Sequence, residues 1–87
     1  MQQDHTVKAA ISRNLDDALE ELVVISEMFR PYAEVDESEF KVRMAHLYSH
    51  LNTVWNVRNA SGADLESADS EQINAWSRFP TDLHPFL

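Results

Sequence analysis

The chain has 87 residues, a length typical of one domain, and carries 15 acidic against 7 basic side chains for a net charge of -8. This charge argues against direct binding to nucleic acid or to an anionic membrane, because both need clustered Lys and Arg. The absence of cysteine excludes disulfides, thiolate nucleophiles and Cys-ligated metals. We see no signal peptide, and no apolar stretch reaches the roughly 20 residues of a membrane span. We therefore expect a soluble, cytoplasmic protein.

The first predicted helix covers residues 6–30. A single glycine and three prolines in the whole chain favour long helices. Apolar residues recur here every three or four positions, which is the period of a helix with one buried face. Asp4 or Thr6 can cap its start, and Pro31 ends it. We expect its core face to be the stripe of Val7, Ile11, Leu15, Ala18, Leu22, Ile25 and Phe29.

The second predicted helix covers residues 37–60. The connection "PYAEV" is short, so this helix should return antiparallel beside the first. Asp36 is its N-cap, with Glu39 three residues later as in a capping box, and Gly62 is a natural C-terminal stop. Its apolar stripe has the same period and consists of Phe40, Met44, Leu47, Leu51 and Val54.

The last third of the chain should form a smaller element. The polar connector "ADLESAD" leaves room for one short turn around Leu65. Asp69 and Gln72 then form a capping-box pair before a short third helix over residues 70–79. The sequence thus predicts an all-α fold in a single helical domain, residues 1–87, built from a long antiparallel helical hairpin, the short helix and a packed C-terminal tail. The residues expected to cover the apolar face of the hairpin are Trp76, Phe79, Leu83, Phe86 and Leu87.

A stripe of asparagines marks the second helix. Asn is a mediocre helix former, yet three recur at i, i+4 and i+7 beside two aromatic residues. One interpretation is structural: amides supply both donors and acceptors to the free backbone groups of the irregular tail, and Arg58 pairs with Asp82. The other is a polar pocket for a small ligand or peptide. We favour the structural interpretation of this candidate groove, which consists of Tyr48, Asn52, Trp55, Asn56, Arg58 and Asn59.

His46 and His50 are weak candidates for a metal site. Histidines at i, i+4 can share a divalent metal, but "HLYSH" lacks the glutamate of a metalloprotease helix. The spacing indicates no third ligand. We therefore expect surface or interface histidines, and we predict no metal, cofactor or catalytic residue.

The function that this pattern favours is a non-enzymatic protein–protein interaction or regulatory module that acts as a homo-oligomer, with a homodimer as the expected form. Two helices cannot close a core, and no catalytic constellation accompanies them. Apolar residues also lie off the pairing stripes, namely Val23, Val24, Val42 and Val57.

Two alternatives remain open. The first is an acidic inhibitor that imitates nucleic acid and binds a basic protein partner. The second is a small metal-dependent enzyme with a site at a dimer interface. The acidic clusters that motivate the first are Asp16, Asp17, Glu20, Glu21 and Glu27, and Asp64, Glu66, Asp69 and Glu71.

Overall fold

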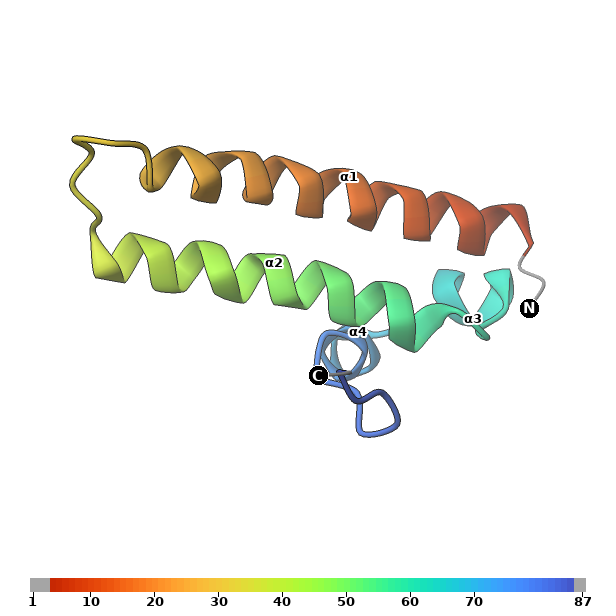
Figure 1. The fold of residues 1–87 in the computed structure, drawn as a ribbon. Helices are drawn as coiled ribbons and strands as arrows, with labels where there is room; N and C mark the ends of the chain where they lie inside the picture. Colours follow the sequence, from red (N-terminus) through yellow and green to blue (C-terminus); the bar gives the residue numbers. More distant parts are fainter. Residues whose placement is uncertain (1–3, 86–87) are drawn as a thin grey trace.

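The structure is a computed structural model that describes residues 4–85, and these residues form four helices. Figure 1 shows the two long helices, α1 (His5–Met28) and α2 (Glu37–Val57), side by side as an antiparallel hairpin. The short helix α3 (Gly62–Glu66) lies at the open end of the hairpin, and α4 (Ser70–Trp76) lies against α2. The predicted all-α fold and its hairpin are confirmed.

Each helix is preceded by a residue whose short side chain caps it. Asp4 accepts from a backbone N–H of α1, so Asp4 and not Thr6 is the cap. Asp36 and Asp69 do the same for α2 and α4, and Ser61, the residue before α3, caps it in a reciprocal capping box. These side chains satisfy donors that a helix start leaves without a partner. The helix starts therefore follow from the local sequence.

The helix ends depart from the prediction. The helix predicted to end at residue 60 ends at Val57, and the one predicted to end at residue 79 ends at Trp76. The prediction that Gly62 ends the second helix is wrong, because Gly62 is the first residue of α3. Its N–H donates to Asp4 Oδ2 at 2.7 Å, and a Cβ at this position would lie 2.9 Å from the same oxygen. A side chain at this position would press against Asp4 and Thr6, because the start of α3 sits directly against the start of α1.

The contact between α1 and α2 is a narrow line. Val7 and Ala18 of α1 and Leu47 and Val57 of α2 are each less than 9% exposed and form its buried apolar part. Hydrophobic burial along this line holds the two long helices together.

Polar contacts lie on the same line and fix the register. Arg43 Nη1 lies 3.4 Å from Glu21 Oε2, and His46 Nδ1 lies 3.6 Å from Glu21 Oε1. Farther along, His50 Nδ1 lies 3.0 Å from Asn14 Oδ1. These pairs set which residues of the two helices lie at the same level.

The predicted core stripes are only partly buried, which corrects the expectation from periodicity. Leu15, Leu22 and Phe29 of α1 are 45%, 48% and 56% exposed, and Leu51 of α2 is 40% exposed. One neighbouring helix covers only the line of contact, and these stripes are wider than that line. The hairpin therefore keeps an apolar flank that its own second helix does not cover.

The tail covers little of this flank. Phe79 is 66% exposed and Leu83 is 45% exposed, so the predicted cover is incomplete. Phe86 and Leu87, which the sequence also assigned to it, lie outside the described residues. The molecule is accordingly elongated, with extents of 48 × 26 × 24 Å and a radius of gyration of 15.0 Å against about 12 Å for a compact chain of this length. Within residues 4–85, no helix has the length and apolar character needed to cross a membrane.

Candidate functional site: the amide clamp and the open face

Asn52 and Asn56 of α2 bind backbone carbonyls at the end of α4, an arrangement that we call the amide clamp. Asn52 Nδ2 donates to the carbonyl of Ser77 at 3.0 Å. Asn56 Nδ2 donates to the carbonyls of Trp76 and Arg78 at 2.7 and 2.9 Å. The last carbonyls of a helix have no partner within the helix, and the two amides supply one. The clamp thus joins the end of α4 to the last two turns of α2.

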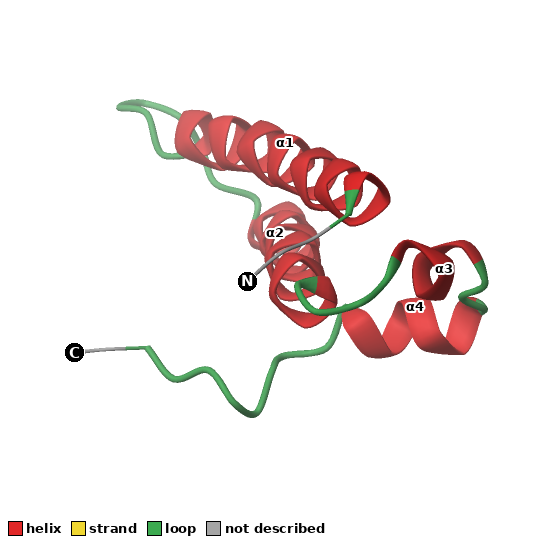
Figure 2. Cartoon of the chain, turned by 90° about the vertical axis from the view of Figure 1, so that its right-hand side faces the viewer, coloured by secondary structure: helices red, strands yellow, loops and turns green. Residues whose placement is uncertain are grey.

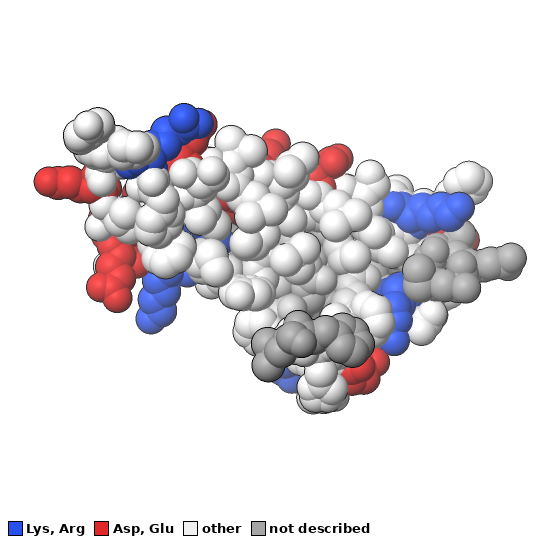
Figure 3. Space-filling model, in the orientation of Figure 1, with Lys and Arg blue, Asp and Glu red and all other residues white. Residues whose placement is uncertain are grey.

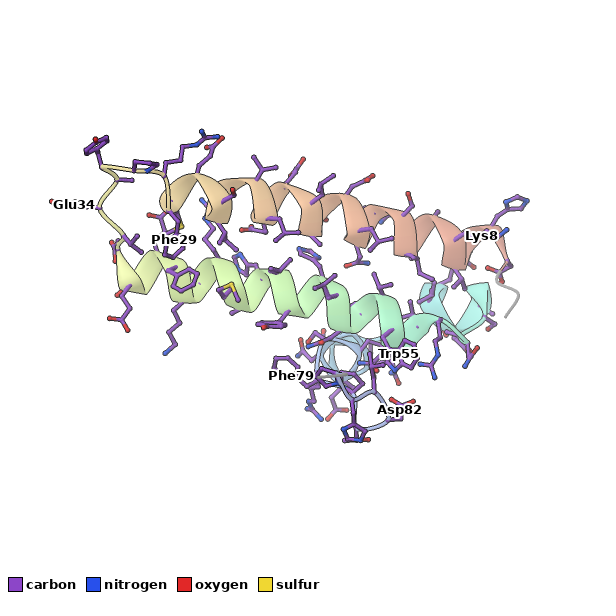
Figure 4. All side chains as sticks on the ribbon, viewed as in Figure 1. Lys8, Phe29, Glu34, Trp55, Phe79 and Asp82 are labelled. Atoms are coloured by element: carbon purple, nitrogen blue, oxygen red, sulfur yellow. The ribbon has the colours of Figure 1, made fainter. Side chains whose placement is uncertain are left out.

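A second attachment lies at Asp82 in the tail. Trp55 Nε1 donates to Asp82 Oδ1 at 3.0 Å, and Arg58 Nη2 donates to Asp82 Oδ2 at 3.3 Å. The Arg58 guanidinium also lies 3.6 Å from the centroid of the Trp55 ring, a cation–π geometry. The hydrogen bond from Trp55, with a smaller effect of Arg58, lowers the pKa of Asp82 below its ordinary value. Figure 4 shows Trp55 and Asp82 facing each other below α2.

The other two members of the candidate groove have different neighbours. The ring of Tyr48 lies 5.2 Å from that of Phe79, and Tyr48 stays 43% exposed. Asn59 is exposed and lines a shallow polar hollow with Asp64 and Asp69. Within residues 4–85, the hydrogen bonds between the asparagine stripe and the end of α4 are made by Asn52 and Asn56. Side-chain donors of Asn52, Trp55, Asn56 and Arg58 therefore bind other parts of the same chain.

The two histidines contribute to the hairpin contact. His46 faces Glu21 and His50 faces Asn14, so both rings reach toward α1. In the described part of the chain, no three His, Cys, Asp or Glu side chains come close enough to hold a metal ion. The alternative of a metal-dependent enzyme stays a prediction without a supporting cluster in residues 4–85.

A cleft of about 530 Å³ lies where the four helices meet, and sequence reasoning missed it. Its size is within the range of small-molecule sites. No single motif could have indicated it, because its lining comes from four separate segments. The lining mixes polar and apolar groups, among them Arg13, Asn14, His50, Val57, Ile73 and Trp76.

One side of the hairpin carries exposed apolar side chains from both long helices, and we call it the open face. The Glu21–Arg43 and Asn14–His50 contacts place Leu15 within one helical turn of the level of Leu51. By helical period these side chains share one side of the molecule. The open face consists of Leu15, Leu19 and Leu22 of α1 and Met44, Tyr48 and Leu51 of α2.

The figures show which parts of the chain lie near this face. Figure 2 shows α3 and α4 together on the other side of the hairpin, while the C-terminal tail runs below α2 toward the side of the open face. Figure 3 views the open face directly: its middle is white, and the acidic and basic side chains gather at its ends and edges. Leu19, on this face, is 61% exposed. Large exposed apolar patches are rare on soluble monomers, and those that occur often mark interaction sites.

Comparison with known proteins gives no family: no protein-family model, no curated protein and no solved structure matches the chain. The function is therefore argued from the geometry of the chain itself.

Proposed function

We propose that the protein is a non-enzymatic protein–protein interaction module that acts as a homodimer through the open face. The observation that supports it is an excess of exposed surface. A folded monomer of this mass exposes about 5200 Å², whereas this chain exposes 6830 Å². The excess of about 1600 Å² is larger than the roughly 800 Å² that each partner buries in a standard interface. One chain alone thus leaves an interface-sized area uncovered.

The side chains of the open face can supply the required free energy. Leu15, Leu19 and Leu22 are 45%, 61% and 48% exposed, so each still has about half of its surface to bury. Burying the remainder contributes roughly 1 kcal/mol for each leucine, and two copies present six of them. Together with the aromatic residues around them, this is of the order needed to offset the loss of translational and rotational freedom on association.

The oligomeric state tests the proposal. Light scattering over a concentration series should give a mass of two chains, and Leu19→Asp should raise the dissociation constant at least about 100-fold, because the dimer would then bury carboxylates without partners. Val42→Asp is the matched control: Val42 is 54% exposed but lies on the opposite side of α2 from Met44. A wild-type monomer at every concentration, or equal dissociation in both variants, would contradict the proposal.

The acidic inhibitor is the second candidate, and the supporting observation is a row of exposed carboxylates on α1 that includes Asp16 and Glu20. Glu21 of the first predicted cluster pairs with Arg43, and Asp64 and Asp69 of the second accept hydrogen bonds at helix starts. Salt separates the two candidates. Binding to a basic protein weakens as salt screens the charges, whereas association of two acidic chains over an uncharged face is maintained or strengthened.

A further inference from the structure

The exposed flank of α1 has a pattern that reads nearly the same in both directions from Leu19. Leu15 and Val23 lie four residues before and after it, and Ser12 and Ser26 lie seven residues before and after it. All five side chains are exposed. On a helix these positions form one strip, with Leu19 at its centre. A strip of this kind can pack against an antiparallel copy of itself.

On α2 the open-face residues Met44, Tyr48 and Leu51 are centred near Tyr48. The contacts of Glu21 with Arg43 and His46 and of Asn14 with His50 place Leu19 of α1 level with residues 45–48 of α2. The centre of the α2 residues therefore lies within one helical turn of the level of Leu19.

This coincidence is what a two-fold symmetric interface requires. In such an interface residue i of one copy meets residue j of the other, and j meets i, so the surface must be complementary to itself about one axis. Two helices whose patterns are centred at different heights could not both satisfy the same axis. The distribution of charged side chains is compatible with such an interface, because the uncharged middle of the face lets two chains of net charge -8 approach with little repulsion.

Resting on the homodimer proposed above, we infer that its partner is a second copy packed face to face about a two-fold axis level with Leu19. In this arrangement α1 runs antiparallel to α1 of the second copy, and the two hairpins form a four-helix bundle. Leu19 meets its own copy, and Ser12 of each chain lies level with Ser26 of the other. The small serines let the two helices approach to the roughly 8–10 Å of packed helix pairs.

Introduced thiols test this arrangement, since the chain has no cysteine of its own. Leu19→Cys should form a disulfide with its copy under mild oxidation, because a residue at the axis brings the two thiols within bonding reach. Ser12→Cys mixed with isotope-labelled Ser26→Cys should give the mixed cross-link, which mass spectrometry identifies by the label. Val42→Cys, on the opposite side, is the control and should cross-link several-fold less at the same concentration.

The outcomes separate this inference from the homodimer itself. Self-cross-links of Ser12→Cys and of Ser26→Cys, without the mixed product, would indicate parallel α1 helices and overturn the arrangement. A dimer by light scattering in which none of the α1 thiols cross-links would place another surface in the interface, and the homodimer would still stand. A monomer at every concentration would overturn both.

Discussion

The two sides of α2 are covered in different ways. On one side, Asn52 and Asn56 bind carbonyls at the end of α4, so the backbone groups there have partners within the same chain. On the side that belongs to the open face, Leu51 remains 40% exposed, and Tyr48, at the border between the two sides, contacts Phe79 and remains 43% exposed. A backbone group without a partner cannot be buried at low cost, so the polar side has to be completed when the chain folds. Apolar side chains in water carry no such requirement, and their cover can come from a second molecule.

The largest expected effect in the folded monomer is on the polar side. Asn52 is 7% exposed, and Asn52→Ala leaves the carbonyl of Ser77 without its donor. We expect the free energy of unfolding to fall by about 2 kcal/mol, measured by urea denaturation at fixed protein concentration. The exposed Asn59 provides the control, because Asn59→Ala should change stability by less than about 0.5 kcal/mol.

The Asn52→Ala variant also tests whether the two sides are independent. If the amide clamp and the open face are independent, Asn52→Ala should retain the mass measured for the wild type by light scattering. A loss of association equal to that of Leu19→Asp would show that the tail takes part in the interface, and the division into two sides would be wrong.

A smaller effect is expected where α3 meets α1. Ala in place of Gly62 would bring a Cβ to 2.9 Å from Asp4 Oδ2 and 3.1 Å from Thr6 Cβ. We expect Gly62→Ala to lower the free energy of unfolding by roughly 1 kcal/mol, although Ala usually favours a helix over Gly. Chemical denaturation of the double variant with Asp4→Ala should show a smaller cost, because the closest atom has been removed. Equal costs in both backgrounds would mean that the close contact is not the cause.

The smallest effect concerns acid and the tail. The hydrogen bond from Trp55 lowers the pKa of Asp82 in the folded chain, so the charged carboxylate stabilises the attached tail. This contribution is present above the unfolded pKa of about 3.9 and is lost as the pH falls through the lower folded value.

We therefore expect the fluorescence of Trp55, followed in a Trp76→Phe background, to change as the pH is lowered below about 4. Asp82→Asn should remove this step while the helical circular dichroism stays unchanged. An identical titration in both chains would assign the acid step to another carboxylate, such as Asp4 or Asp64, whose pKa values are also lowered.

The sequence by itself determined the helices and most of the way they are joined. Capping side chains such as Asp36 and Asp69 and the three- and four-residue period act over one or two turns, so they can be recognised without knowing the fold. The short connection after Pro31 then required an antiparallel hairpin. The amide stripe was also visible, and its chemistry pointed to the backbone of the tail.

Only the tertiary structure decided which groups are covered. Periodicity identifies residues that share a face, but it does not say how much of that face a neighbour covers, so the stripe that includes Leu15 and Leu22 could be predicted while its exposure could not. Asn52 and Asn59 have the same chemistry, and their different roles follow from where the end of α4 lies. Gly62 likewise owes its role to Asp4, which lies far away along the chain. Such contacts join segments distant in sequence, and their geometry is set by the packing of whole helices, which no local pattern contains.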